Sequence, residues 1–529
     1  MGRFLAFLIL VGSVMLFVQG CSGGGGGGDS VASAISDDPN NTPPASGDPD
    51  DPGGPVSTIG VGELGTLVDL GDLLAPAGDH WYFTRAAGIN DAGTVIGQSL
   101  SKTAFKWEPA TGAMTALEVH SGSYDDFFNI GFEAEEPRKS LIYSEAVDIN
   151  GSGVIIGNLT TGLGWPQDLE KRAFIWKDGV FTDLAPPSFL VPGPTFTDGE
   201  ADEDTITFYR VTNKYSEAVD INEKGEVVLT MDDADGRHAY YWNGVDFDPV
   251  DLGYFDDNGP TGPVSIMAPR VSLMARIVGE DSEAVAINEN GQAVMNSGRT
   301  AVFYDLNWQV AESLNHLPGA TFTAAVDIND SVYTNNDGIV DGHIIGNSGS
   351  AFDPADLEAA VLGGNVQGFF WDGGAMYPVD HLGGGTSVAT DINNSDQVVG
   401  GATTADGLVH AFLWTLDENE KGIIRDLGTL GGANSFATAI NEAGQVTGWA
   451  ETGVFYEEEG VVLPIRHAFL WDDGVMYDLG THNDFYDYAF VPSYPFSEGV
   501  GINATAEVAG NSITINEHYR GFFLSPEFP

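Results

Sequence analysis

The sequence predicts an all-β fold, a β-propeller of about eight four-stranded blades, and three observations lead to this prediction. A short aromatic motif recurs along the chain and is identical, HAFLW, at His410–Trp414 and His467–Trp471. A second motif, which ends in Ile-Asn, precedes each copy of the first. Turn-forming residues separate the motifs, and 70 of the 529 residues are Gly. Recurrence of one such unit is typical of repeat architectures.

The aromatic motif occurs eight times in all. Its residues are apolar on both alternating faces, whereas a strand with one hydrated face alternates apolar with polar residues. We therefore expect a strand covered on both sides, as in propeller blades that stack against two neighbours. The six further copies are TAFKW, RAFIW, HAYYW, AVFY, GFFW and GFFL, at Thr103–Trp107, Arg172–Trp176, His238–Trp242, Ala301–Tyr304, Gly368–Trp371 and Gly521–Leu524.

The Ile-Asn motif also occurs eight times, and a short turn followed by an apolar run such as GTVIG or GQVTG comes after most copies. This pattern predicts a tight hairpin between the first two strands of each unit, with Gly at a positive φ. Asp178-Gly179, Asn243-Gly244 and Asp473-Gly474 predict a second hairpin, between the third and fourth strands. The Ile-Asn motifs end at Asn90, Asn150, Asn222, Asn288, Asn329, Asn393, Asn441 and Asn503.

The two ends of the chain predict how the ring closes. Gly65–Gly71, GTLVDLG, is similar to the fourth strand within Ile423–Gly432, whereas the last unit stops at GFFLSPEFP without a fourth strand. The N-terminal strand is therefore expected to complete the C-terminal blade. Seven blades is the alternative count, because the fourth unit matches least well. A β-solenoid is the alternative architecture, and it would not need one end to complete the other.

The N-terminus has the pattern of an export signal. Residues 1–20 carry one Arg followed by an apolar run, which predicts a signal peptide. Val18-Gln19-Gly20-Cys21 resembles the lipobox of bacterial lipoproteins, and this resemblance implies lipidation of Cys21, the single Cys of the chain. Ser22 in place of Asp implies sorting to the outer membrane of a Gram-negative bacterium, on either its periplasmic or its outer side. An uncleaved membrane anchor is the alternative.

Composition separates a tether from a folded domain and limits the partners. Residues 21–56 are rich in Gly, Pro, Asp and Ser and predict a disordered tether, and residues 57–529 form the repeat domain. The formal net charge is −57, which excludes nucleic acid and anionic lipid surfaces as partners. The membrane is therefore contacted only through the lipid. The domain has no Cys for disulfides, and we expect a monomer.

The combined pattern resembles the bacterial extracellular HAF repeat over about residues 60–524, most closely at Ser387–Gly432 and Ser435–Gly480. This resemblance implies an exported protein with a propeller-like fold, and it provides no catalytic residues. His occupies the first motif position only at His238, His410 and His467, so we expect these side chains to be structural. The chain also lacks the HExxH, GxSxG, phosphate-loop and CxxC motifs, so enzymatic activity is uncertain and the less favoured interpretation.

The long insertions, among them Asn347–Gln367 and Glu451–Arg466, are expected on one face of the propeller, where binding sites on rigid scaffolds usually lie; Asp330–Gly342 is the exception. Aromatic side chains beside Asp and Asn are suited to a glycan or an exported protein, although they also occur where loops pack onto blades. This predicts a binding or scaffold module, with a polysaccharide-degrading enzyme as the alternative. The candidate ligand-binding residues are Trp81, Tyr82, Phe127, Phe128, Phe485, Tyr486 and Tyr488.

One segment suggests a cation. Thr334–Gly342, TNNDGIVDG, resembles a calcium loop in which Asn335, Asp337 and Asp341 supply oxygen ligands. Tyr333 replaces the first ligand and Ile344 replaces the late Glu, so the match is incomplete. Structural calcium is thus the one cofactor that the sequence suggests, with a plain Asp-Gly turn as the alternative.

Overall fold

The described part of the chain covers most of the repeat domain. Residues 1–57, with the predicted signal peptide, Cys21 and the whole predicted tether, lie outside it. No helix among the described residues is long and apolar enough to span a membrane. The computed structural model describes residues 58–60, 64–65, 67–71, 73, 84–99, 103–117, 140–162, 170–184, 189–192, 208–211, 215–232, 236–245, 249–253, 264–265, 281–307, 310–331, 333–334, 340–350, 352–458, 461–481, 496–513 and 519–528.

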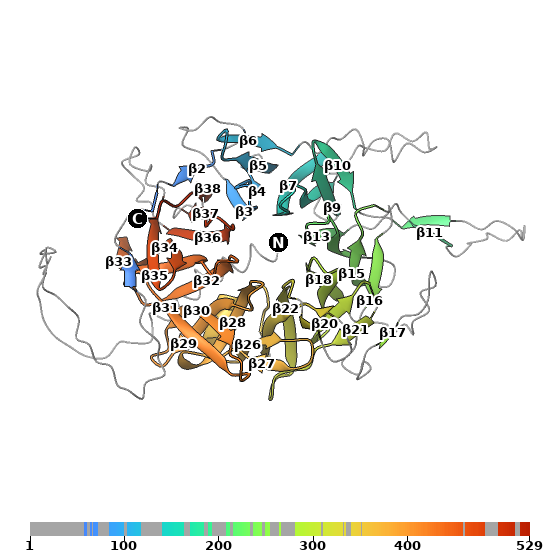
Figure 1. The fold of residues 1–529 in the computed structure, drawn as a ribbon. Helices are drawn as coiled ribbons and strands as arrows, with labels where there is room; N and C mark the ends of the chain where they lie inside the picture. Colours follow the sequence, from blue (N-terminus) through green and yellow to red (C-terminus); the bar gives the residue numbers. More distant parts are fainter. Residues whose placement is uncertain are drawn as a thin grey trace, which may run out of the picture.

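The described strands form four-stranded antiparallel units, here called blades 1 to 8, around a central axis (Figure 1). Blades 1 to 4 consist of β3 (Arg85–Ile89), β4 (Val95–Gln98), β5 (Ala104–Glu108) and β6 (Ala113–Ala116); β7 (Ser140–Ile149), β8 (Ile155–Gly162), β9 (Glu170–Lys177) and β10 (Val180–Asp183); β13 (Ser216–Ile221), β14 (Val227–Asp232), β15 (Arg237–Trp242) and β16 (Val250–Gly253); and β18 (Ser282–Ile287), β19 (Gln292–Ser297), β20 (Thr300–Asp305) and β21 (Val310–Ser313).

The second half of the ring repeats this arrangement, and the first strand of every blade lies nearest the axis (Figure 1). Blades 5 to 8 consist of β22 (Phe322–Ile328), β25 (Ile344–Gly349), β26 (Val366–Trp371) and β27 (Met376–Pro378); β28 (Gly383–Ile392), β29 (Val398–Thr404), β30 (Val409–Leu416) and β31 (Gly422–Gly428); β32 (Ser435–Ile440), β33 (Val446–Glu458), β34 (Val461–Asp472) and β35 (Val475–Gly480); and β36 (Phe496–Ile502), β37 (Val508–Ile513), β38 (Tyr519–Leu524) and β2 (Val68–Asp69).

Several short elements outside this plan were not predicted from the sequence. One further strand runs parallel to β35 at the outer edge of blade 7, another lies beside β21, and two pairs form small separate hairpins. These elements are β1 (Thr58–Gly60), β17 (Val264–Ser265), β11 (Phe189–Pro192) with β12 (Phe208–Val211), β23 (Tyr333–Thr334) with β24 (Val340–Asp341), and the helix α3 (Leu357–Gly363).

The two ends of the chain meet in blade 8, as the sequence predicted. β2 pairs antiparallel with β38, with Val68 opposite Phe523. Arg520 on β38 forms an ion pair of 2.7 Å with Asp69 on β2. Leu70 and Phe523 then pack in one core with Phe105 and Trp107 of blade 1. A solenoid would leave its two ends apart, so the closed arrangement supports the propeller with eight blades.

The aromatic third strands are buried on both faces, as predicted. In blade 6, Phe412 and Trp414 are fully buried. They lie in one core with Phe370 of blade 5, whose ring centroid is 5.6 Å from that of Trp414. Ala411, on the opposite face of the same strand, is buried in a core with Phe469 of blade 7. Burial of a large apolar side chain contributes about 1.5–3 kcal/mol. The repeated motif therefore stabilises the contact between neighbouring blades.

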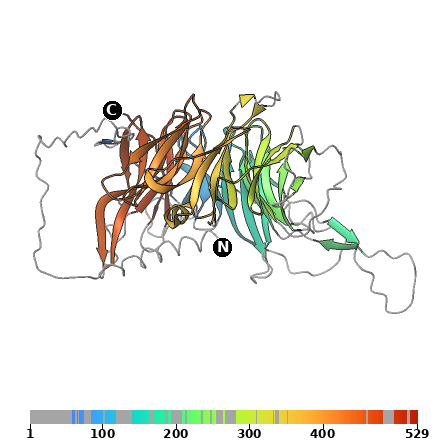
Figure 2. The same cartoon turned by 90° about the horizontal axis from the view of Figure 1, so that it is seen from below.

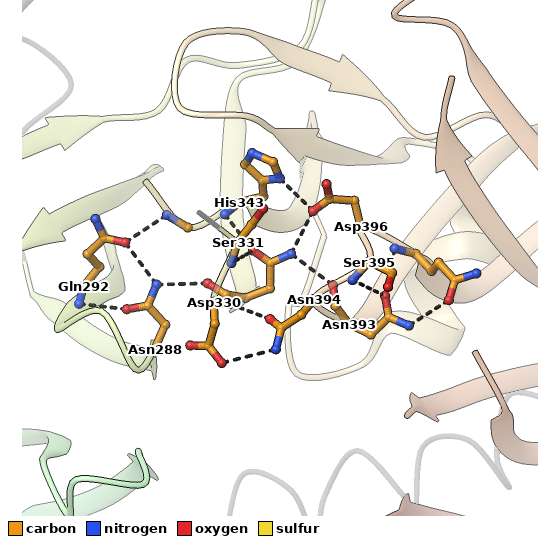
Figure 3. Close-up of polar contacts among 12 residues, drawn as sticks. Asn288, Gln292, Asp330, Ser331, His343, Asn393, Asn394, Ser395 and Asp396 are labelled. Atoms are coloured by element: carbon orange, nitrogen blue, oxygen red, sulfur yellow. Dashed lines mark hydrogen bonds and ion pairs between the residues drawn. The ribbon is translucent and has the colours of Figure 1, made fainter. Parts of the chain in front are cut away.

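The Asn residues of the eight Ile-Asn motifs form a closed ring of hydrogen bonds, here called the Asn ring. Each Asn Nδ2 donates to the backbone carbonyl of the ring Asn in the next blade, at 2.9–3.2 Å. The last bond runs from Asn503 to Asn90 and joins blade 8 to blade 1. Figure 3 shows the part of the ring around Asn288 and Asn393. Side chains thus connect every blade to the next one.

The turn after each ring Asn needs a backbone with positive φ, and Gly provides it in most blades. Gly444, for example, has φ 79° in blade 7. Asp396 and Ala506 occupy the same position in blades 6 and 8, with φ 58° and 63°. The predicted Asp178-Gly179 and Asp473-Gly474 hairpins have positive φ at both residues, as a type I′ turn requires.

The Asn ring predicts a specific loss of stability. Asn441→Ala removes the donor to Asn503 and the acceptor of the Ala443 and Gln445 N–H groups. Because buried polar groups lose their partners, we expect the free energy of unfolding to fall by about 2–4 kcal/mol in urea titrations followed by Trp fluorescence. Asn419→Ala, in an exposed turn, should change it by less than about 0.5 kcal/mol. Equal losses in the two variants would contradict a special role for the ring.

Candidate functional site

The two faces of the propeller differ, and Figure 2 shows them edge-on. One face carries the short turns after the ring Asn residues, together with the β23–β24 hairpin. The other face carries α3 and the long β33–β34 hairpin. The seven predicted ligand-binding residues lie outside the described residues, so their placement stays a prediction: Trp81, Tyr82, Phe127, Phe128, Phe485, Tyr486 and Tyr488.

Two connections on the second face differ from the predicted loops. The predicted insertion 347–367 contains α3, whose N-cap Asp356 accepts the Ala359 N–H at 3.0 Å. Good helix formers follow this cap in Leu357–Gly363. The predicted insertion 451–466 continues the strands of blade 7 instead, with Phe455 opposite Pro464. Runs of β-branched and aromatic residues on both sides favour strands there.

The short-turn face uses its polar side chains internally. In six blades, the side chain of the residue after the ring Asn accepts the N–H of the corresponding residue in the preceding blade. The Glu289 N–H donates to the Asp330 carboxylate at 2.6 Å, and the Asp330 N–H donates to Asn394 Oδ1 at 2.7 Å. Glu442 and Asp91 accept in the same way. These side chains connect neighbouring blades, so the candidate site is sought on the other face.

On the other face, five side chains from separate segments converge at the mouth of the axis, and we call them the mouth cluster: Arg85, Glu358, Trp449, Arg466 and Glu498. The first strand of a blade begins on this face, so Arg85 on β3 and Glu498 on β36 lie at the mouth. α3 contributes Glu358, whereas the strands of blade 7 contribute Trp449 and Arg466.

Glu358 attaches α3 to blade 7. The Trp449 Nε1–H donates to Glu358 at 2.7 Å, and Arg466 Nη1 lies 3.5 Å from the other carboxylate oxygen. The guanidinium of Arg466 stacks on the Trp449 ring at 3.7 Å. Burial raises the pKa of Glu358, and the nearby Arg466 charge opposes this effect. The arrangement resists separation of the helix from the blade.

Glu498 differs from the other carboxylates at this mouth. The equivalent first-strand residues Glu145, Glu217 and Glu283 have basic neighbours, such as Lys171 at 2.6 Å from Glu217. The Glu498 carboxylate has no hydrogen bond or ion pair in the part of the chain that the structure describes. Burial raises its pKa to about 7, the charge of Glu358 adds to this rise, and Arg85 and Arg466 oppose it. Such perturbed groups are typical of functional sites.

Deeper along the axis, four carboxylates form a second feature, here called the channel carboxylates: Asp148, Asp220, Asp327 and Asp391. Each lies two residues before a ring Asn, next to a β-bulge that recurs in the first strand of every blade. Asp220 accepts the Ile287 N–H of the next blade at 2.7 Å, and Asp391 accepts the Ile440 N–H at 2.8 Å. They therefore connect blades as well.

The channel carboxylates also contact each other in pairs. Burial raises the pKa of Asp220, and the adjacent Asp148 raises it further. Burial and the charge of Asp391 do the same to Asp327. Burial raises the pKa of Asp391 to about 6. Two carboxylates that lie against each other cannot both ionise without cost, so each pair favours binding one proton.

The His residues of the aromatic motif are structural, as the sequence predicted. His410 Nδ1 lies 2.9 Å from Asp426, and His467 Nδ1 lies 2.8 Å from Asp478, on the fourth strand of the same blade. In blade 2, Arg172 replaces His and pairs with Asp183 at 2.6 Å. The first position of the motif therefore holds a side chain that pairs with the fourth-strand Asp, and this role does not require an imidazole.

The calcium prediction stays a prediction. Asn335 and Asp337 lie outside the described residues, and Asp341 lies on β24 with its side chain not described. Among the described side chains, no group of three or more His, Cys, Asp or Glu residues is placed to hold a metal ion.

Comparisons with known proteins add little. No family model and no curated protein matches the chain, so the HAF resemblance stays a prediction from the sequence. Solved structures match at low identity. An acylaminoacyl peptidase of Pyrococcus horikoshii has 9% identity and a TM-score of 0.36, over 70% of this chain and 49% of that chain. A puromycin-hydrolyzing peptidase of Mycobacterium tuberculosis has 12% and 0.37, over 73% and 51%.

A dipeptidyl peptidase 4 of Porphyromonas gingivalis has 9% identity and a TM-score of 0.39, over 82% of this chain and 57% of that chain. The matches to these three peptidases thus span about half the length of each of them. At these TM-scores the likeness carries no argument about activity. The propeller assignment depends on the sheets and on the closed Asn ring of this chain.

The channel carboxylates predict how stability depends on pH. The pKa values of Asp220, Asp327 and Asp391 are raised in the folded state, so these groups contribute stability at low pH that is lost as pH rises through the folded pKa. For Asp391 this window extends from about pH 4 to beyond 6. We expect the free energy of unfolding to fall by about 1–3 kcal/mol between pH 5 and pH 8 in urea titrations.

The control separates this effect from the repulsion among surface charges. Asp327→Asn should reduce the fall and raise stability at pH 8, whereas Asp406→Asn removes the same charge at an exposed position and should not. If the two variants keep the same pH profile as the parent protein, the paired carboxylates do not control it.

Proposed function

We propose that this chain is an extracytoplasmic binding or scaffold module, held at the outer membrane through lipid on Cys21. Its face with α3 and the β33–β34 hairpin would engage a glycan or an exported protein. The observation that supports this most strongly is the difference between the faces. The short-turn face satisfies its own polar groups through the Asn ring, whereas the other face carries the longer connections, where variable binding elements on scaffolds usually lie.

The charge of the molecule restricts its partners to uncharged or cationic ones. The formal net charge of −57 repels nucleic acid and anionic lipid. The carboxylates Glu145, Glu217, Glu283 and Glu498 lie at the axis mouth on the proposed binding face. A neutral glycan, or an exported protein with a basic surface, is therefore the class of partner that fits.

A polysaccharide-degrading enzyme is the second candidate, and the mouth cluster favours it specifically. Glu358 and Glu498 are two carboxylates with raised pKa values beside two arginines, and glycoside cleavage commonly uses a pair of acids. Glu358, however, already accepts a hydrogen bond from Trp449 and pairs with Arg466. This use of Glu358 in attaching α3 makes binding the preferred function.

The function is tested with full-length protein, solubilised in mild detergent, on immobilised laminarin, xylan, dextran and galactomannan. We expect retention on at least one glycan without new reducing ends, because the site binds hydroxyl groups and holds no free acid pair. Retention is measured with calcium and then with chelator, and a loss on chelation would assign a role to Thr334–Gly342. New reducing ends would favour the enzyme. Absence of both signals would direct the search to exported proteins.

A further inference from the structure

Glu498 is the carboxylate at the axis mouth that the fold itself does not use. Lys171 lies near both Glu145 and Glu217, Arg237 lies near Glu283, and Arg466 pairs with Glu358. No described side chain forms an ion pair or hydrogen bond with the Glu498 carboxylate, and the residue is partly exposed. Its carboxylate oxygens are not among the buried polar atoms that lack a partner, so a ligand at the mouth can reach them.

Two arginines, Arg85 and Arg466, lie near Glu498. Arg85 begins β3 in blade 1, adjacent to blade 8 across the closure of the ring, and this residue is exposed. Arg466 contacts Phe496, two residues before Glu498, with its guanidinium 5.9 Å from the ring centroid. Arg85 and Glu498 occupy equivalent positions of adjacent blades, each five residues before its ring Asn, and both therefore lie at the same mouth of the axis.

The Trp449 ring is not available for a ligand to stack on. The Trp449 ring is the nearest large aromatic surface in the mouth cluster, but it is 3% exposed. Arg466 lies over the ring at 3.7 Å, and Phe436 stacks with it at 6.3 Å and 10°. A ligand at the mouth would be recognised by hydrogen bonds instead.

We propose that Glu498 and Arg85 form a subsite that binds an uncharged sugar residue at the mouth of the propeller axis. This inference rests on the proposed glycan-binding function and names the contact within it. A pair of sugar hydroxyls donates to the Glu498 carboxylate, and a sugar oxygen accepts from the Arg85 guanidinium. The negative charge of a uronic acid would be repelled by Glu498 and Glu358, and the positive charge of an amino sugar would be repelled by Arg85 and Arg466. A neutral sugar avoids both repulsions.

The affinity of the subsite for a neutral sugar should fall as the pH decreases. The ionised carboxylate offers both oxygens as acceptors, whereas a proton converts one of them to a donor. Burial raises the pKa of Glu498 to about 7. The other titratable and charged groups that face it are Arg85, Arg466 and Glu358. Affinity for a neutral sugar is therefore highest above pH 7 and falls as the pH decreases to 6.

The experiment titrates full-length protein in mild detergent with the hexasaccharides of laminarin, xylan, cellulose, starch and mannan, by calorimetry at pH 8 and pH 6. Hydrogen bonds to a charged carboxylate are strong, so Glu498→Gln should lower the affinity for the sugar tenfold or more at pH 8. The variant should also show the same affinity at pH 8 and at pH 6. Arg85→Met should lower the affinity as well. Glu442→Gln, on the opposite mouth, is the matched control and should leave the affinity unchanged.

Each outcome decides the proposal. Thermal melting shows whether Glu498→Gln is folded, and a neutral amide at this position should not lower the melting temperature. Binding that is unchanged in folded Glu498→Gln would overturn the subsite while the glycan-binding function stands. Absence of binding to every hexasaccharide would overturn both. Cleavage of a hexasaccharide that stops in Glu498→Gln would support sugar contact at Glu498 and transfer the function to the enzyme class.

Discussion

The hydrogen-bond ring of the eight Ile-Asn motifs is the constraint on which the rest of the molecule depends. Each ring Asn caps its own turn with Oδ1 and reaches the next blade with Nδ2, so all eight turns must lie at one height around the axis. Insertions in these turns are poorly tolerated for that reason. Blade 5 has one, and there Asn329 accepts the N–H of His343, beyond the insertion, in place of the usual nearby residue. Longer segments therefore accumulate on the other face, where this constraint does not apply.

The repeated motifs show which parts of the fold a sequence can predict. Eight copies of two motifs became eight blades, and Gly65–Gly71 supplied the missing strand because its pattern matched that of the other fourth strands. The turn role of the ring Asn residues was also predictable. Their bond to the next blade was not, because it joins residues 41 to 72 positions apart and one pair at opposite ends of the domain.

The mouth cluster was unpredictable for a similar reason. Arg85, Glu358 and Glu498 lie far apart along the chain, and no local spacing connects them. Glu358 depends on a helix that breaks the all-strand pattern, and Trp449 and Arg466 come from two different strands of blade 7, β33 and β34. Sequence reasoning expected function on the face with long connections, and this stays a prediction. It selected aromatic loop residues there and did not consider the charged residues at the ends of regular strands.

Positions where the repeats agree are explained by structure. Ser435 illustrates this, since its hydroxyl accepts the Ala411 N–H of the preceding blade at 2.8 Å and donates to the Gly428 carbonyl at 2.6 Å. The position five residues before the ring Asn is different, because the eight blades place Arg85, Glu145, Glu217, Glu283, Ala324, Val388, Phe436 and Glu498 there. The apolar members of this row are buried, and Val388 and Phe436 pack in one core with Val361 of α3. Glu145, Glu217 and Glu283 have basic partners. The fold therefore explains most of the variation at this position, and the Glu498 carboxylate differs because no described residue pairs with it.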